Sequence, residues 1–369
     1  MRILFDHQAF SLQVTGGITR YFYELVRHFN QIEDTSTTTQ LGYCSTVWPL
    51  KEASKPCGKI LHWGPRPVKS GVGTYFINEL LLNPYNLAQP RVDIYHNTLY
   101  RFMPSVRARL YVATHHDCTI ERFPDLFPEA AVVIKAKKQM LKKADFVFCV
   151  SEASRQDLHS FYDYDRSQTL ALPLGLARLP RSPQAQAELK RRINRPFILY
   201  VGTRAAYKNF SRLLRGFGAS GIKSDYHLLA VGGGEFSSKE KQEVASLDLA
   251  SAVVSIPLAS GELLAEAYSA ASAFVYPSLY EGFGLPPLEA MEKGCRVLVS
   301  ANPACMEVCK DAALFFDPFD EADLARKLQA VLEDTDENKR RVERGYEVYQ
   351  LYQWPEVTQK MIAAYRSLL

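Results

Sequence analysis

The sequence predicts an α/β protein built from two doubly wound parallel-sheet domains. Its 369 residues exceed what one hydrophobic core usually serves, and 47% hydrophobic with 23% charged residues is ordinary for a folded chain. Short runs rich in β-branched and aromatic residues alternate with helix-period segments along the chain. Because these runs are apolar on both faces, they predict parallel strands covered by helices on both sides.

The expected strands fall into two groups along the chain. The first group lies at 2–5, 92–96, 110–116, 146–151 and 169–174, and the second at 197–203, 227–234, 252–257, 273–278, 296–302 and 313–318. Residues 177–196 are proline-bracketed, polar and basic, so we expect a linker between a first domain, 1–176, and a second, 197–353. Apolar positions at helical spacing in 354–369 predict a closing helix.

Charge and cysteine content exclude several classes of protein. The net charge of +4 is too mild for a nucleic-acid-binding protein, although the excess lies in the first half, which we expect to face something acidic. The seven cysteines lack metal-ligand spacing and predict reduced thiols in a cytoplasm. We expect no membrane-spanning segment and no signal peptide, because no apolar run is long enough.

The segment 276–298 carries the most specific chemistry. Glu281 and Glu289 stand eight positions apart around a glycine loop and a proline pair, and we expect Glu289 in the first turn of the following helix. Such a loop presents backbone N–H groups to phosphate oxygens, whereas carboxylates accept hydrogen bonds from neutral hydroxyls. A nucleotide sugar meets both demands. The expected donor-binding residues of the loop are Gly282, Phe283, Gly284 and Leu285.

Basic residues follow the strand expected at 197–203. Arg204 and Lys208 lie four positions apart, where they would neutralise a diphosphate leaving group without a metal. A solvated basic pair is the plain alternative for this segment. Gly233, in the turn after the next strand, is expected near the nucleotide base.

Two further candidates lie in the first half. Gly16 and Gly17 precede an amphipathic helix and are expected to approach an anion closely. Of the adjacent pair His115 and His116, only one side chain should enter the site, and we favour His116 as a hydrogen-bonding group near the reacting sugar over a purely structural histidine. We expect no metal site, because the Asp-Tyr-Asp at 163–165 reads as a turn.

Several segments, in family order, resemble the retaining glycosyltransferases of family 4, also called group 1 glycosyltransferases. They are VSEASRQDL (150–158), LPLG (172–175), VGT with YKN (201–209), VGGGE (231–235) and PSLYEGFGLPPLEAMEKG (277–294), followed by Glu307 in PACMEV. The likeness covers most of the chain, and the two-glutamate segment is its most specific part. It implies the GT-B architecture: two Rossmann-like domains facing across a cleft, with the acceptor on the first, the donor on the second, and the final helix packed onto the first.

The resemblance implies a hexosyltransferase that keeps the anomeric configuration and needs neither metal nor cofactor beyond its nucleotide diphosphate sugar. By position, Glu281 matches the glutamate that holds the donor sugar, Glu289 the ribose ligand, Lys208 the phosphate lysine, His116 the histidine beside the reacting centre, and Gly16 with Gly17 the amino-terminal glycine loop. One departure stands out. Thr203 occupies the place where many members carry arginine, and Arg204 comes one position later.

The acceptor is less clearly encoded. We favour a mannose-like donor and a glycan or lipid-linked acceptor in surface polysaccharide or lipopolysaccharide assembly. Lysines clustered at 135–143 and apolar residues at 75–85 suggest peripheral contact with an anionic membrane at its cytoplasmic face, a solvated helix face being the alternative. The competing classes are a nonhydrolysing nucleotide-sugar epimerase or phosphorylase of the same architecture, and a noncatalytic binding protein.

Overall fold

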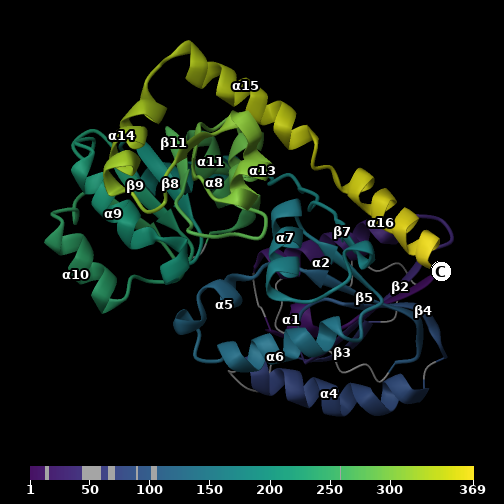
Figure 1. Cartoon of the computed structure of the whole chain (residues 1–369). Helices are drawn as coiled ribbons and strands as arrows, with labels where there is room; N and C mark the ends of the chain where they lie inside the picture. Colours follow the sequence, from purple (N-terminus) through teal and green to yellow (C-terminus); the bar gives the residue numbers. More distant parts are fainter. Residues whose placement is uncertain (13–15, 44–59, 65–70, 89, 101–105, 258) are drawn as a thin grey trace. The chain divides into compact units, whose positions relative to one another are not determined.

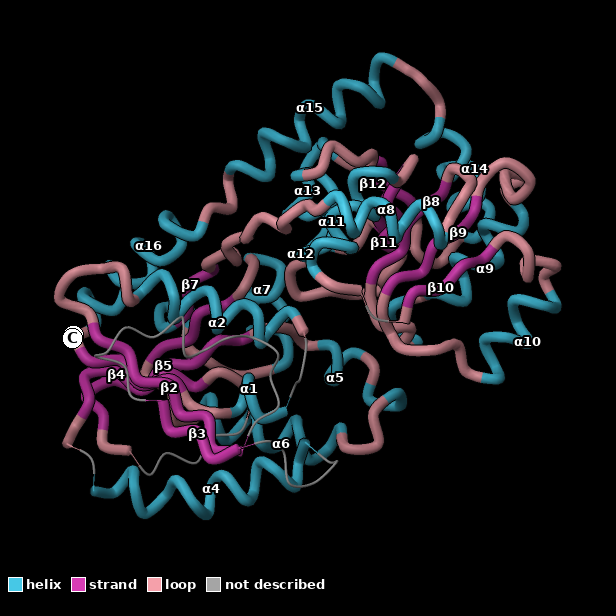
Figure 2. The backbone as a smooth tube through the Cα atoms, turned by 180° about the vertical axis from the view of Figure 1, so that it is seen from behind, coloured by secondary structure: helices cyan, strands magenta, loops and turns pink. Residues whose placement is uncertain are grey.

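The chain forms two compact α/β units. The computed structural model describes residues 1–12, 16–43, 60–64, 71–88, 90–100, 106–257 and 259–369. One unit comprises Met1–Gly175 with Gln353–Leu369, and the other comprises Leu176–Tyr352. Each is a parallel sheet with helices on its faces, as Figures 1 and 2 show. The predicted fold class of two doubly wound parallel-sheet halves is confirmed.

The first unit has a seven-stranded sheet of order β3-β2-β1-β4-β5-β6-β7, parallel throughout its described residues. Its strands are β1 (Arg2–Phe5), β2 (Ser36–Tyr43), β3 (Ile60–Gly64), β4 (Val92–Asn97), β5 (Ala108–His115), β6 (Phe146–Cys149) and β7 (Thr169–Ala171). Its helices are α1 (Gln8–Leu12), α2 (Gly17–Phe29), α4 (Gly71–Ala88), α5 (Thr119–Arg122), η1 (Pro124–Leu126), α6 (Ala130–Leu141), α7 (Glu152–Phe161), η2 (Arg166–Gln168) and α16 (Trp354–Leu368).

The second unit has a six-stranded parallel sheet of order β10-β9-β8-β11-β12-β13. Its strands are β8 (Phe197–Val201), β9 (His227–Val231), β10 (Val253–Ile256), β11 (Ala273–Tyr276), β12 (Val297–Ser300) and β13 (Leu314–Phe316). Its helices are α8 (Pro183–Arg192), η3 (Ala206–Lys208), α9 (Phe210–Ala219), α10 (Ser238–Ser246), α11 (Gly261–Ala270), α12 (Leu285–Glu292), α13 (Pro303–Cys309), η4 (Lys310–Ala312), α14 (Glu321–Leu332) and α15 (Asp336–Gln350).

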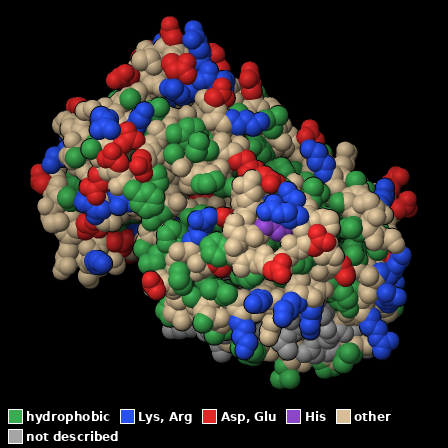
Figure 3. All heavy atoms as spheres, in the orientation of Figure 1, with side chains coloured by type: hydrophobic (Ala, Val, Ile, Leu, Met, Phe, Trp, Pro, Cys, Tyr) green, Lys and Arg blue, Asp and Glu red, His purple; other side chains and the backbone are tan. Residues whose placement is uncertain are grey.

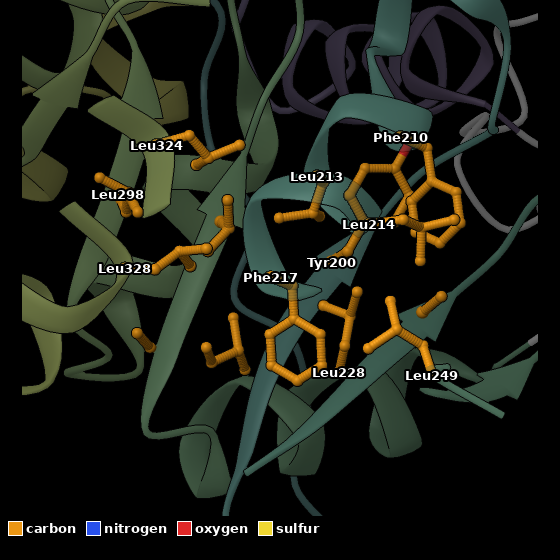
Figure 4. Packing of buried hydrophobic residues seen from close by; sticks show 14 of the residues in the cluster. Tyr200, Phe210, Leu213, Leu214, Phe217, Leu228, Leu249, Leu298, Leu324 and Leu328 are labelled. Atoms are coloured by element: carbon orange, nitrogen blue, oxygen red, sulfur yellow. The ribbon is translucent and has the colours of Figure 1, made fainter. Parts of the chain in front are cut away.

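The core of the second unit lies where α9 and α14 cover its sheet. Tyr200, Phe217 and Leu228 are almost wholly buried there, and Figure 4 shows their side chains beside those of Leu213 and Leu214. Gly216 lets the two helices approach, because a Cβ at this position would lie 2.8 Å from a methyl carbon of Leu324. Close packing of this kind holds the strand ends in fixed positions.

The last helix, α16, belongs to the first unit and packs on α2. Tyr365 is fully buried, its ring meets Phe29 and Phe148 edge to face, and its hydroxyl hydrogen-bonds with Nδ1 of His96. Trp354 stacks between Tyr21 and His28. The helix therefore contributes aromatic core to a unit whose other residues lie far from it in the sequence.

Residues 177–196, expected as a linker, lie inside the second unit. There α8 packs against α11, and the guanidinium of Arg181 donates two hydrogen bonds of 3.0 Å to the carboxylate of Glu266. Ser182 caps α8 by accepting from the backbone N–H of Ala185. A helix that buries only Ala185 and Leu189 retains a polar composition, which is why the segment resembles a linker in sequence.

The sequence prediction missed two strands, β2 and β3. The sequence of β2, STTTQLGY, has no apolar run, yet Thr37, Thr39 and Gln40 are buried on it. The hydroxyl of Thr37 donates to Oδ1 of Asn30 at 2.7 Å, and the backbone of β2 pairs on both sides, with β1 and β3. The five cysteines among the described residues are buried and free, whereas Cys44 and Cys57 lie outside those residues.

Candidate functional site

The candidate residues of the second unit follow the strands at the centre of its sheet. The chain runs outward from β8 to β9 and β10 and then returns to β11 on the other side of β8. This reversal, called the switch point of the sheet, leaves an opening at the carboxyl ends of the two strands beside it, β8 and β11. Ligands of open α/β sheets bind at such openings. Lys208 follows β8 and Glu281 follows β11, so the two come from either side of this switch point.

Lys208 and Glu281 form an ion pair between these two loops. Nζ of Lys208 lies 2.6 Å from Oε1 of Glu281 and 3.4 Å from the hydroxyl of Tyr276, at the end of β11. The Lys208 and Glu281 side chains keep only 16% and 12% of their exposure. The loops are also joined directly, because the backbone N–H of Leu279 donates to the carbonyl of Tyr207 at 2.8 Å. A cation and a carboxylate are thus held in place before any ligand arrives.

The glycine loop leads into α12 as expected, but Glu289 lies beyond the first turn of this helix. Gly284 has φ of 104°, a left-handed conformation that favours glycine, and it is the N-cap of a helix beginning at Leu285. The prediction that Glu289 lies in the first turn is therefore wrong: no acidic residue occupies that turn. The prolines that follow Leu285 are tolerated inside the first turn of α12, because the backbone N–H groups of a first helical turn have no partner within the helix and their loss costs no hydrogen bond.

Two residues of the loop region face the interior. Phe283 is buried and meets the ring of Tyr352 edge to face, with centroids 5.6 Å apart, so only its backbone is placed to contact a ligand. Glu289 is 6% exposed and accepts a hydrogen bond of 3.1 Å from the hydroxyl of Tyr268 on α11. That bond helps to fix the position of the carboxylate.

Arg204 is turned toward the loop after β9. Its Nε lies 2.5 Å from Oε1 of Glu240, and its terminal nitrogens donate to the carbonyls of residues 232–235 at 2.6–3.2 Å. Gly233 lies in this loop with φ of 75°. The expected pair of Arg204 and Lys208 on one diphosphate is therefore not the arrangement seen, since the guanidinium faces backbone oxygens.

In the first unit, His116 lies directly after β5 and is 6% exposed. Its Nε2 is 3.0 Å from the carbonyl oxygen of Thr98, and because a carbonyl only accepts, this nitrogen carries the proton. Burial lowers the pKa of His116 to about 4, with smaller effects from the backbone bond, Asp117 and Lys137. The ring is therefore neutral near pH 7, with Nδ1 as an acceptor that suits a hydroxyl donor.

Asp6 and Thr98 support His116 from the neighbouring strand ends. The carboxylate of Asp6, directly after β1, accepts hydrogen bonds from the side chain and backbone N–H of Thr98 and from Gln8. Asp6 was not among the predicted site residues, although its position after the first strand was the available signal. His115 points elsewhere, with Nε2 3.6 Å from the sulfur of Cys118, so the two histidines do separate as expected.

Gly16 and Gly17 form the start of α2, after the short helix α1 that the sequence did not predict. Both are exposed, and Gly16 has extended backbone, with φ of 164° and ψ of 166°. That conformation is open to any residue, so these glycines matter for the absence of side chains rather than for backbone geometry.

Lys137 was expected on an exposed basic face, and this prediction is wrong. Its side chain is 1% exposed and lies 2.6 Å from Oε1 of Glu121, 2.8 Å from the carbonyl of Asp117 and 4.1 Å from the ring centre of Tyr100. It therefore holds the turn that follows His116. The hydroxyl of Tyr162 also donates to Glu121, which helps to satisfy this buried carboxylate.

No helix in the described parts of the chain is long and apolar enough to cross a bilayer. Of the aspartates at 163–165, Asp165 accepts from the backbone N–H of Ser167 and caps η2. That is the turn role expected from the sequence.

Comparison with known proteins identifies the relatives of this chain. Residues 182–348 match the family model "Glycosyl transferases group 1". The chain is 27% identical over its full length to the full length of "O-antigen chain mannosyltransferase B" of Escherichia coli. It is 28% identical to "O-antigen chain mannosyltransferase RfbU" of Salmonella typhimurium over 61% of each chain.

Two solved structures share the fold over the whole chain. Sucrose-phosphate synthase from Thermosynechococcus elongatus matches with a TM-score of 0.76 at 21% identity, covering 100% of this chain and 99% of that one. Anabaena HepE, solved in complex with UDP and glucose, matches with a TM-score of 0.79 at 15% identity, covering both chains fully. The resemblance to group 1 glycosyltransferases and the GT-B fold class are confirmed, and nothing found favours the epimerase or phosphorylase alternative.

Proposed function

We propose that this chain, which resembles the group 1 glycosyltransferases, transfers a mannose-like hexose from a nucleotide diphosphate sugar to a hydroxyl of a glycan or lipid-linked acceptor. The reaction keeps the anomeric configuration and needs no metal ion. The observation that carries the proposal is the preformed Lys208–Glu281 pair beside a glycine-capped helix start, at the switch point of the second sheet. The mannosyltransferase names of its relatives support the choice of sugar and of polysaccharide assembly.

In this proposal each side chain of the second unit has one task. Lys208 stabilises the negative charge that grows on the diphosphate as the sugar bond breaks, and the backbone of residues 282–284 adds hydrogen-bond donors. Glu281 accepts hydrogen bonds from sugar hydroxyls, and Glu289 accepts from the ribose. Since phosphate repels carboxylates, the acidic side chains select the neutral parts of the donor and the lysine selects the charged part.

In the first unit, His116 accepts a hydrogen bond from a hydroxyl of the transferred sugar through Nδ1. Its low pKa keeps it neutral, so it orients the sugar without adding positive charge. The acceptor hydroxyl attacks on the face from which the diphosphate leaves, and an oxygen of the departing phosphate takes its proton. With the departing phosphate as the proton acceptor, the proposed reaction requires no further base and no metal ion.

The donor proposal is tested by a thermal-shift panel of GDP-, UDP-, dTDP- and ADP-sugars in the presence of EDTA. A donor at one hundred times its Kd stabilises the protein by about 2.7 kcal/mol, which raises the Tm by about 5–10 °C for a unit of this size. A rise seen only after Mg²⁺ or Mn²⁺ is added would contradict metal independence. No rise with any of the four donors, with or without metal, would contradict the proposal itself.

Retention is tested separately on the product. With an α-linked donor and its acceptor, NMR of the new linkage should show an α anomeric proton, and a β signal would exclude the same-face attack. Glu281→Ala should reduce transfer at least a hundredfold while leaving the melting temperature of the free protein within a few degrees. Comparable turnover in Glu281→Ala and the unmodified protein would show that Glu281 does not hold the donor sugar for transfer.

A peripheral membrane contact is part of the proposal for the acceptor side. Phe76, Leu80 and Leu87 of α4 are 60%, 76% and 65% exposed and lie on one face of the helix. The four lysines that remain exposed on or after α6 are Lys135, Lys138, Lys142 and Lys143, and Figure 3 shows basic side chains gathered in that region. Because the β3-to-β4 and β5-to-β6 connections step through the sheet in the same direction, right-handed crossovers put both helices on one face.

Lysines near an anionic bilayer contribute about 1 kcal/mol each, and the apolar side chains add burial in the interface. The protein should sediment with vesicles containing phosphatidylglycerol at low salt and be released at high salt. Replacing the four lysines by glutamine should abolish the sedimentation, whereas the same change at Lys190 and Lys223 of the second unit should not. Equal sedimentation of all three proteins would exclude this face as the contact.

A further inference from the structure

Arg204 is surrounded by acceptors of its own chain. Its side chain is 4% exposed, and its guanidinium contacts Glu240 through Nε and the carbonyls of Gly232, Gly233 and two more residues through its terminal nitrogens. The ring of Phe236 lies below it, 4.7 Å from Cζ to the ring centre. A guanidinium has five N–H groups, and these contacts use most of them.

This environment opposes a role for Arg204 in phosphate binding. A phosphate beside the guanidinium would approach a carboxylate that is already 2.5 Å from Nε, and it would compete with carbonyl oxygens for the same donors. Burial raises the pKa of Glu240, but hydrogen bonds from Ser237 and Arg204 outweigh it, and the pKa lies below its usual value. Glu240 is therefore charged at neutral pH.

The loop after β9 is shaped around Arg204. Gly232, Gly233 and Gly234 all have positive φ, of 93°, 75° and 77°, which turns their carbonyls toward the guanidinium. A Cβ on Gly233 would lie 2.7 Å from a terminal nitrogen of Arg204, so a side chain at this position would displace the guanidinium from its present place. The other side of the loop is tied to the strand beside it, since Gly232 and Gly234 donate backbone N–H to the carbonyls of Ile256 and Pro257.

We propose that Arg204 is a positioning residue that fixes the turn 232–235, and that this turn contacts the nucleoside of the donor while the diphosphate depends on Lys208. The inference rests on the proposed function and deepens it. Gly233 and Gly234 are exposed at the carboxyl end of β9, next to β8, and lack side chains that would keep a flat base away. A turn of three positive-φ glycines is costly to order, and one cation that binds four of its carbonyls offsets that cost.

The two roles of Arg204 predict opposite effects of Glu240. If Arg204 were a phosphate ligand, Glu240→Gln would free it and would leave nucleotide affinity unchanged or improved. If Arg204 positions the turn, Glu240→Gln and Arg204→Gln should both weaken binding of the best nucleoside diphosphate from the donor panel by about tenfold. Inorganic pyrophosphate should bind both variants as it binds the unmodified protein. Titration calorimetry measures all of these affinities.

Ser237 supplies the matched control, because Glu240 also accepts from Ser237 in the capping box of α10. Ser237→Ala removes that cap but not the ion pair, and nucleotide affinity should change less than twofold. Weaker pyrophosphate binding in Arg204→Gln together with unchanged or tighter nucleotide binding in Glu240→Gln would overturn the inference.

Hydrogen exchange of the ligand-free protein tests the turn without any donor. Amides of residues 232–236 should exchange at least tenfold faster in Arg204→Gln and Glu240→Gln than in Ser237→Ala or the unmodified protein. Unchanged exchange would show that Arg204 does not order the turn. If the exchange result holds but no nucleotide binds the unmodified protein, the proposed function fails and the positioning role stands.

Discussion

Glu281→Gln should tighten the binding of a nucleoside diphosphate and remove the preference for its sugar-bearing form. In the ligand-free protein Glu281 neutralises Lys208 at 2.6 Å, so an incoming diphosphate must share the lysine with a carboxylate. The variant keeps the shape of the side chain and removes its charge. The change therefore isolates electrostatic repulsion from packing.

The magnitude follows from the geometry of the pair. A phosphate oxygen in hydrogen-bond contact with Nζ of Lys208 would lie within about 5–6 Å of the Glu281 carboxylate. Two unit charges at that separation repel by about 3 kcal/mol at an effective dielectric constant near 20. Because both side chains keep some exposure, solvent and salt reduce this, and we expect about 1–2 kcal/mol, or roughly tenfold tighter binding of the diphosphate.

The nucleotide sugar should respond differently. It gains the same relief from repulsion but loses a hydrogen bond to a charged acceptor, which contributes about 1.5–3 kcal/mol. The ratio of the two dissociation constants, sugar-bearing over sugar-free, should therefore rise at least tenfold. Calorimetric titration of both ligands at low salt measures the ratio, with Glu343→Gln on the exposed face of α15 as the control. Unchanged or weaker diphosphate binding in Glu281→Gln would refute the electrostatic reasoning.

Three further predictions concern the first unit. Burial raises the pKa of Asp6 from 3.8 to about 6 against the lowering effects of His7, Thr98 and Gln8, so the stability contributed by its proton is full below about pH 4 and is lost as pH rises through 6, by roughly 3 kcal/mol. In urea unfolding, the stability of the unmodified protein relative to Asp6→Asn should fall by this amount between pH 4 and 7, because the opposite contributions of buried histidines such as His116 are common to both proteins and cancel in the difference. Gly175→Ala should destabilise the unit by about 1–3 kcal/mol, because its Cβ would lie 2.4 Å from the ring of Trp354, and calorimetric scanning measures the loss. Lys137→Met should cost about 3–5 kcal/mol by leaving Glu121 buried without its cation, and adding Glu121→Gln should recover part of that loss in the same unfolding assay.

Each of these has a control or a contrary outcome. A stability difference between Asp6→Asn and the unmodified protein that stays constant from pH 4 to 7 would show that Asp6 does not carry the effect. Gly261→Ala should be nearly neutral, since its Cβ meets nothing closer than 3.8 Å, and a loss equal to that of Gly175→Ala would remove the steric explanation. A double variant at Lys137 and Glu121 less stable than Lys137→Met would show that the two do not act as a pair.

The sequence alone determined the alternation of strands and helices, the number of α/β units and the residues of the glycine loop. Apolar runs such as those of β8 and β11 can be recognised in the sequence without knowing which strands they pair with. A strand buried on both faces needs nonpolar residues at every position. Polar β2 has no such signal, since its residues become buried only when the strand pairs with β1 and β3 in the folded sheet. The segment 177–196 was misleading for a related reason: the two buried positions of its helix α8 are covered by packing against α11, about eighty residues later.

Only the tertiary structure decided what each charged side chain faces. Arg204 and Lys208 are four residues apart and both cationic, yet one is turned to four carbonyls of the β9 turn and the other to a carboxylate after β11. Lys137 lies among exposed lysines in sequence and is buried against Glu121 in space. Local patterns specify strands and turns because those depend on neighbouring residues, whereas the partner of a charge is set by elements that meet only when the sheet forms.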